Sequence, residues 1–151
     1  MIDSDNVLLL RPTSAASGFQ LENASRAPLG STMKREGVLV ATIYHLRKTK
    51  GAAFADFFEQ ELTPHLTKAG ISVLASFVTE THLNTFPRLP VREDANVFVW
   101  FSRFRDREAY DKCAATVGEL MRQREVTTKL TELTKGQSEV LLLSSTPRSL
   151  L

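Results

Sequence analysis

Residues 97–104 read Val-Phe-Val-Trp-Phe-Ser-Arg-Phe, a run in which apolar side chains fall on both alternating faces. In a β-strand, successive side chains point to opposite sides. One face of this run then holds Val97, Val99 and Phe101, and the other holds Phe98, Trp100 and Phe104. Because aromatic and β-branched residues also favour strands, the stretch predicts a strand that is buried on both sides.

Three further segments have the composition of strands. Two of them, residues 38–47 and 71–79, again carry apolar groups on both faces, and a shorter one covers residues 139–144. Antiparallel sheets with one solvated face usually alternate apolar and polar side chains. Strands that are apolar on both faces therefore need a cover on each side of the sheet.

Helical periodicity fills the gaps between these strands. Over residues 51–69 the apolar positions recur at spacings of three and four, which is typical of an amphipathic helix. These positions are Phe54, Phe57, Phe58, Leu62 and Leu66. Pro64 is expected to kink this helix or to begin a second short one, because it lacks an amide donor and crowds the preceding turn. A second helical region runs from an N-cap at Asp106 to about Leu133, with Gly118 as the candidate break.

The elements follow one another as strand, helix, strand, strand, helices, strand, which is the split βαββαβ plan of ferredoxin-like folds. We therefore predict an α+β domain with a four-stranded antiparallel sheet and its helices on one face. Since the helices leave the second face open, another layer must cover it. A second copy of the same sheet would do so, and we expect a homodimer that closes into an α/β barrel.

The first 36 residues differ in composition from the rest. Val7–Leu10 resembles a short buried strand, whereas residues 11–36 are rich in Ser, Ala, Gly and Pro without a lasting period, which is typical of a flexible linker. We place the barrel domain at residues 37–151. The run Val-Leu-Leu-Leu recurs at Val140–Leu143, so the first strand could correspond to the closing strand of an upstream copy.

Composition and charge narrow the classes of function. The 151 residues are 42% hydrophobic and 24% charged, and 19 basic against 17 acidic residues leave a net charge of +2 without a run of like charge. This balance argues against a nucleic-acid partner. The longest apolar runs are far shorter than a bilayer span, so no membrane insertion is expected. With one cysteine and no signal-peptide pattern, we expect a cytoplasmic protein.

Three stretches of the chain resemble the NIPSNAP family within the dimeric α/β-barrel superfamily. They are Tyr44-His-Leu-Arg47, the segment Phe86-Pro-Arg-Leu-Pro-Val-Arg-Glu93 followed by Val97-Phe-Val-Trp-Phe101, and the ending Thr146-Pro-Arg-Ser-Leu150. The resemblance runs from about residue 37 to the C-terminus and implies the ferredoxin-like fold and its pairing into a barrel. It implies little chemistry, because the activity of the family is poorly defined. His45 stands where the family motif usually has Glu, so no role of that acidic side chain carries over.

Candidate ligand contacts lie on two of the predicted strands. Tyr44 and His45 point to opposite faces, as do Trp100 and Arg103. Tyr44 offers a hydroxyl and Trp100 a flat surface for stacking. His45 could relay protons near neutral pH, and Arg103 is a permanent cation. The alternatives are that Tyr44 and Trp100 pack in the core, that His45 lies at a strand surface, and that Arg103 sits near a strand end or an acidic partner. All four cannot line one pocket.

The connection over residues 81–95 carries further polar candidates. Its prolines exclude regular pairing there, and it would lie at one end of the barrel, where long loops supply lids and binding groups. It holds His82, Asn84, Arg88 and Arg92, although a plain hairpin connection is the alternative. Without a thiolate cluster, a helical pair of histidines or a glycine-rich phosphate loop, we expect neither a metal nor a cofactor. Cys113 falls on an apolar helix stripe and is expected to be a small buried hydrophobe.

Two functions fit this sequence. The first is a barrel module that binds a small apolar or aromatic ligand, and the second is a non-enzymatic scaffold whose barrel is filled by its own side chains. The resemblance adds a cofactor-independent enzyme of the monooxygenase type as a further alternative, whereas no histidine has the context of a haem ligand. An open cavity near Tyr44 and Trp100 would separate binding from scaffolding. Whether the protein is an enzyme stays open at this point.

Overall fold

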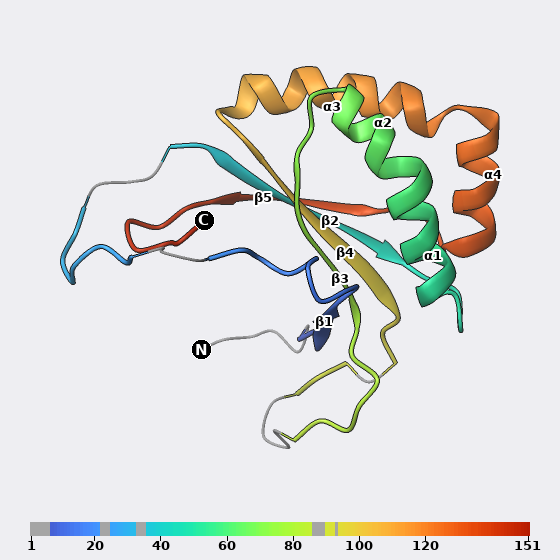
Figure 1. Ribbon diagram of the computed structural model, residues 1–151, viewed down its shortest axis with the longest axis horizontal. Coiled ribbons are helices and arrows are strands. Elements are labelled where there is room, and N and C mark those ends of the chain that lie inside the picture. Colours follow the sequence, from blue (N-terminus) through green and yellow to red (C-terminus); the bar gives the residue numbers. More distant parts are fainter. Residues whose placement is uncertain (1–6, 22–24, 33–35, 86–89, 93) are drawn as a thin grey trace.

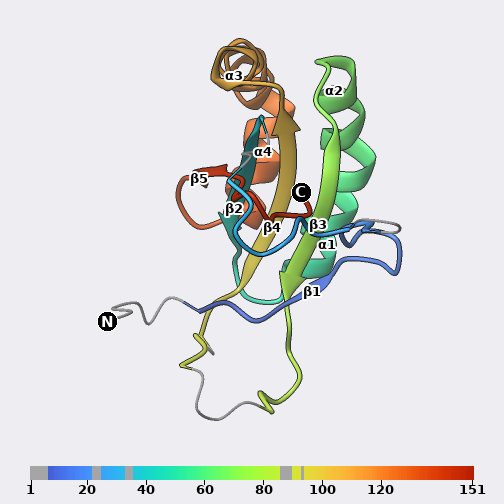
Figure 2. The same cartoon turned by 90° about the vertical axis from the view of Figure 1, so that its left-hand side faces the viewer.

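The computed structural model describes residues 7–21, 25–32, 36–85, 90–92 and 94–151. Five strands form one antiparallel sheet in the order β1-β3-β4-β2-β5, and the helices lie together on one side of it (Figures 1 and 2). The strands are β1 (Leu10–Pro12), β2 (Val38–His45), β3 (Val73–Thr79), β4 (Val97–Phe104) and β5 (Glu139–Ser144). The predicted α+β, ferredoxin-like plan is confirmed, with β1 added to the four strands expected.

The central strand β4 pairs with β2 on one side and with β3 on the other. On the helix side, Phe98 and Trp100 pack against Phe58 with ring centroids 4.7 and 5.5 Å apart. Val97 and Val99 are buried on the opposite face. Both faces of this strand are covered, as its composition predicts.

The long helix after β2 contains a π-helical segment. It consists of α1 (Gly51–Phe57), η1 (Phe58–Leu62) and α2 (Thr63–Lys68). Pro64 accounts for the wider turn, since it has no amide to donate and its ring crowds the preceding turn. The amide of Thr63 instead reaches back to the carbonyl of Phe58. A second short helix therefore begins next to Pro64, which is one of the two outcomes expected there.

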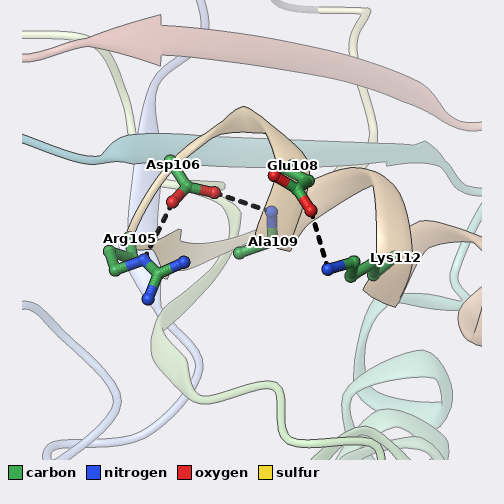
Figure 3. A network of polar contacts seen from close by, with 5 residues as sticks. All are labelled: Arg105, Asp106, Glu108, Ala109 and Lys112. Atoms are coloured by element: carbon green, nitrogen blue, oxygen red, sulfur yellow. Dashed lines mark hydrogen bonds and ion pairs between the residues drawn. The ribbon is translucent and has the colours of Figure 1, made fainter.

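The second helical region begins at a capped residue. It consists of α3 (Arg107–Met121) and α4 (Arg124–Leu133). The side chain of Asp106 accepts a hydrogen bond from the amide of Ala109 at 2.8 Å, as Figure 3 shows. This bond satisfies one of the free amides of the first turn, so the N-cap predicted from the sequence is confirmed.

The break between these two helices lies at Gln123, whose backbone is extended, and not at Gly118 as expected. Gly118 stays helical because the residues beyond it, Leu120 and Met121, still pack on the core. That packing outweighs the roughly 1 kcal/mol that a glycine costs inside a helix. Within the described part of the chain, no helix is long and apolar enough to cross a membrane.

The N-terminal strand lies further along the chain than its composition indicated. β1 pairs with the end of β3, with Leu10 opposite Thr79, whereas the sequence pointed to Val7–Leu10. Because β3 ends at Thr79, the residues before Leu10 have no strand of the sheet beside them there. Val7 instead forms a parallel bridge to Val91 in the connection between β3 and β4.

A turn that follows β1 is fastened to the middle of β3 by Ser76. The amide of Thr13 donates to the Ser76 carbonyl at 3.1 Å, and the amide of Ser76 donates to the Ser17 carbonyl at 2.9 Å. The hydroxyl oxygens of Thr13 and Ser76 lie 2.7 Å apart, and the Thr13 hydroxyl donates to that of Ser17 at 2.8 Å. The first residues of the expected linker are thus hydrogen-bonded to the sheet.

The side of the sheet away from the helices is covered in part by the chain itself. The segment after β1 and the C-terminal residues lie on this side (Figures 1 and 2). Phe19 packs on Phe77 and Phe101 with ring centroids 5.5 and 4.9 Å apart. In contrast, Leu141 and Leu143 of the edge strand β5 point to this side and are 45% and 39% exposed. The chain therefore covers β3 and β4 where Phe19 packs, and leaves β5 open.

Candidate functional site

A cleft of about 1060 Å³ opens at one end of the sheet. Its walls come from β1, the turn between β2 and α1, the first turns of α1, and the long connection between β3 and β4. The apolar part of its lining consists of small or aliphatic side chains, which include Leu9, Ala52, Ala55, Val78 and Ala95. The polar connection of residues 81–95, expected at one end of the barrel, forms one wall here with its described residues.

The N-terminal strand ties the walls of the cleft together. The amide of Glu80, just after β3, donates to the carbonyl of Leu9 at 2.8 Å. The amide of Arg92, at the far end of the same connection, donates to the carbonyl of Val7 at 2.9 Å. The extended segment before β1 thus joins both ends of the β3–β4 connection.

The charged side chains around the cleft form two groups. In the first, Glu80 accepts from the amide of His82 at 2.9 Å and pairs with its imidazole at 2.6 Å. The hydrogen bond from the backbone amide of His82 holds the pKa of Glu80 below its ordinary value, and the imidazole of His82 adds to this effect. Arg92 lies 3.9 Å from Asp94. The second group has no ion pair with any described residue and consists of Arg11, Lys48 and Asp56.

The turn that presents Lys48 to the cleft is strained. Thr49 has a φ of 62°, in the left-handed region that β-branched residues rarely adopt. Its hydroxyl donates to the carbonyl of Lys48 at 2.6 Å. Strain of this kind costs roughly 1–3 kcal/mol and concentrates at functional sites. Its position in the cleft wall supports the cleft as the candidate site.

Two of the four candidates on the strands, Tyr44 and Trp100, lie in the core between the sheet and the helices, and neither lines the cleft. The Tyr44 ring packs on Phe54 at 5.0 Å, and burial raises the pKa of its hydroxyl to about 12. The indole N–H of Trp100 lies near that hydroxyl and partly offsets the rise in its pKa, but the contact falls short of hydrogen-bond geometry. Among the described residues this N–H has no hydrogen-bond partner. Aromatic side chains fill the layer around both residues.

The other two candidates, His45 and Arg103, lie on the opposite face of the sheet. His45 Nε2 lies 2.5 Å from Oε1 of Glu139 on β5. Arg103 Nη2 donates to the carbonyl of Glu36 at 2.9 Å. Gly37 permits this close approach, because its φ is +112° and a Cβ there would lie 2.9 Å from a carbonyl oxygen of β4. The four candidates thus fall into two pairs on opposite faces, as alternation predicts.

The loop candidates do reach the cleft. His82, Asn84 and Arg92 line it, whereas Arg88 lies outside the described residues. Arg11, Lys48 and Asp56 were not predicted as site residues, because they come from three separate segments and form no motif. Cys113 is half-buried against the core, with its Sγ 3.9 Å from a backbone carbonyl. Over the ranges described above, no cluster of three His, Cys, Asp or Glu side chains could hold a metal ion.

Comparison with known proteins places the fold. No family model matches the chain, and no curated protein matches it significantly. Among solved structures, a NIPSNAP family protein of Agrobacterium tumefaciens is 17% identical, covers 72% of this chain and 91% of its own, and has a TM-score of 0.50. A second NIPSNAP family protein of that organism is 16% identical, with coverage of 74% and 89% and a TM-score of 0.51. The chain has a NIPSNAP-like fold.

The NIPSNAP-like fold agrees with the resemblance seen in the sequence. At 16 and 17% identity the likeness concerns the fold alone, and the second of these structures is itself described as having unknown function. The chemistry of the cleft therefore depends on the residues of this chain.

Proposed function

We propose that this NIPSNAP-like protein binds a small molecule with an apolar or aromatic body in the cleft at the end of the sheet. The cleft itself is the observation that supports this most. Its volume of about 1060 Å³ is slightly above the range of about 300–1,000 Å³ that is typical of small-molecule sites. Its lining combines aliphatic side chains, which can contact an apolar body, with charged side chains that can fix the orientation of a ligand.

The layer between the sheet and the helices supports a different role. Tyr44 and Trp100 are enclosed there by Phe54, Phe58 and Phe98, so this part of the molecule favours the filled interior of a scaffold. In our proposal Tyr44 and Trp100 stabilise the core. His45 and Arg103 lie on the second face of the sheet, where they would meet a partner surface. The ligand contacts are assigned to the cleft.

Thermal-shift screening with quinones, aromatic acids and fatty acids tests the ligand proposal. Binding to the native state raises stability by about 2.7 kcal/mol at a hundredfold excess over Kd. Ala52 lines the cleft, whereas its neighbour Ala53 is exposed and does not. Ala52→Trp should therefore obstruct the cleft and abolish the shift, and Ala53→Trp should retain it. If no compound raises the melting temperature, or if the two variants show equal shifts, the proposal is contradicted.

We also propose that two copies pair through the side of the sheet away from the helices. The support is β5, where Leu141 and Leu143 point to that side and are 45% and 39% exposed at the edge of the sheet. Exposed apolar side chains gathered on one side of a sheet are typical of an interaction site. Sedimentation at micromolar concentration should then give twice the chain mass of 16.8 kDa. A clean monomer would contradict pairing. The cytoplasmic location stays a prediction from the sequence.

A further inference from the structure

We infer that the ligand of this cleft carries an anionic group, a carboxylate or a phosphate ester, held by Arg11 and Lys48 while its apolar body lies against the aliphatic lining. The inference rests on the proposed binding function and names the chemical class of the ligand. It is carried by the charges that the chain leaves unpaired at the cleft.

Three cations and three carboxylates belong to the described lining of the cleft, so their formal charges balance with a neutral His82, but they are not engaged equally. Glu80 is engaged by His82, and Arg92 lies beside Asp94. These two pairs leave the cations Arg11 and Lys48 against the single carboxylate of Asp56, none of which has an ion pair within the described part of the chain. Two cations without an ion pair therefore stand against one such carboxylate, and these two cations are the groups that an anionic ligand would engage.

The two cations belong to different walls of the cleft. Arg11 lies on β1 directly opposite Val78 of β3, so the two side chains share the helix-facing side of the sheet. Val78 also lines the cleft and belongs to the hydrophobic core. Lys48 comes from the turn before α1. A guanidinium can hold a carboxylate or phosphate through two parallel hydrogen bonds, and an ammonium adds a point charge from the other wall.

Asp56 orients the ligand in this site. It lies on α1, one turn beyond Ala52, and both residues line the cleft. A carboxylate there repels an anionic group placed along α1, so the anionic end of the ligand is directed toward Arg11 and Lys48. Replacement of Asp56 by Asn removes this repulsion and should tighten the binding of anions, which is the reverse of the effect expected at the two cations.

Calorimetry with matched ligands tests this inference. The ligands share a naphthalene body and differ in charge: 2-naphthoate, 2-naphthyl phosphate, neutral 2-naphthamide and the cationic 2-naphthylmethylammonium. We expect at least one anion to bind about tenfold or more tightly than the amide, and added salt to weaken the anion only. Arg11→Gln and Lys48→Gln should each weaken that anion roughly five- to tenfold and leave the amide unchanged.

Lys68→Gln provides the matched control, because Lys68 is exposed on α2 and does not line the cleft. It should bind the anion as the unmodified protein does, and thermal unfolding should show that all four variants remain folded. Tighter binding of one anion identifies the head group as carboxylate or phosphate.

Equal binding of amide and anion, or stronger binding of the ammonium compound, overturns the anionic class and leaves the binding function standing. If none of the four ligands binds, the anionic class is overturned. If the thermal-shift screen with quinones, aromatic acids and fatty acids also shows no binding, the proposed binding function is overturned as well.

Discussion

Tyr44 is a phenol enclosed in an aromatic layer, and this position fixes how it titrates. Burial raises its pKa from 10.0 to about 12. Between these two values the folded protein keeps the proton while the unfolded chain releases it. The contribution of Tyr44 to stability is therefore fully present below pH 10.0 and is lost as the pH rises toward 12. The loss amounts to at most about 3 kcal/mol.

Tyr44→Phe removes the ionisable hydroxyl and keeps the ring that packs on Phe54. We expect urea unfolding to show that the unmodified protein loses stability between pH 9 and 11.5 and that Tyr44→Phe loses distinctly less. Tyr110→Phe changes the only other tyrosine and should retain the alkaline loss. If Tyr44→Phe and the unmodified protein lose the same free energy over this range, Tyr44 is not the titrating group.

Single residues also show where sequence reasoning succeeds. The opposite orientation of Tyr44 and His45 follows from the two-residue period of a strand, which is a local property. The cleft charges follow no such rule. Arg11, Lys48 and Asp56 lie in three separate segments, and nothing local distinguishes them from other solvent-facing charges. Only the pairing of β1 with β3 brings Arg11 to the cleft.

Among the elements, the strands with long apolar runs follow the sequence most closely. β4 and β5 have the predicted bounds, because their composition leaves few alternatives. The position of β1 depends on where β3 ends, and the end of α3 depends on packing beyond Gly118. Both positions are set by tertiary contacts, and the local sequence signals predicted both of them wrongly.

The start of α3 carries a prediction on pH. The backbone amide of Ala109 and the guanidinium of Arg105 both donate hydrogen bonds to the carboxylate of Asp106 (Figure 3). These hydrogen bonds hold the pKa of Asp106 below its ordinary value of 3.8, and the one from Ala109 has the larger effect. The cap is therefore fully effective above that pH and weakens as the pH falls through the lower pKa of the folded protein.

Asp106→Ala removes the cap and should lower the melting temperature at pH 7, whereas Asp106→Asn retains an oxygen that accepts from the amide of Ala109. Circular dichroism at pH 7 and pH 3 measures both variants. Towards pH 3 the melting temperature of the Asn variant should rise relative to that of the unmodified protein, because the Asn cap does not titrate. An Ala variant as stable as the unmodified protein at pH 7 would show that the cap does not stabilise α3.

A hydroxyl pair, Thr13 with Ser76, adds to the backbone hydrogen bonds that attach β1 and the turn after it to β3. Thr13→Val leaves the buried Ser76 hydroxyl without this partner, which should cost roughly 1–3 kcal/mol in urea unfolding. Thr13→Ser keeps the hydroxyl and should retain most of the stability. Deletion of residues 1–12 should destabilise the protein as well. If Thr13→Val is as stable as Thr13→Ser, the hydroxyl pair does not hold β1.

At the scale of the whole molecule, the second face of the sheet is covered unevenly. The sequence predicted that this face needs a cover, because three strands are apolar on both sides. It did not predict that the chain supplies part of the cover, since Phe19 is a single aromatic residue within a segment of small and polar residues. The open part of the face lies at β5, so a second copy would meet the sheet there.

The edge strand β5 allows a test that separates pairing from folding. Leu141 and Leu143 lie opposite Ala41 and Leu39 on the second face, whereas Val140 and Leu142 point to the helix side, and all four are similarly exposed. Leu141→Asp with Leu143→Asp should weaken self-association at least about a hundredfold in sedimentation, because pairing would bury unpaired carboxylates. Val140→Asp with Leu142→Asp carries the same charge on the other face and should leave pairing intact. Equal weakening by both pairs of substitutions would show that the copies do not meet through the second face.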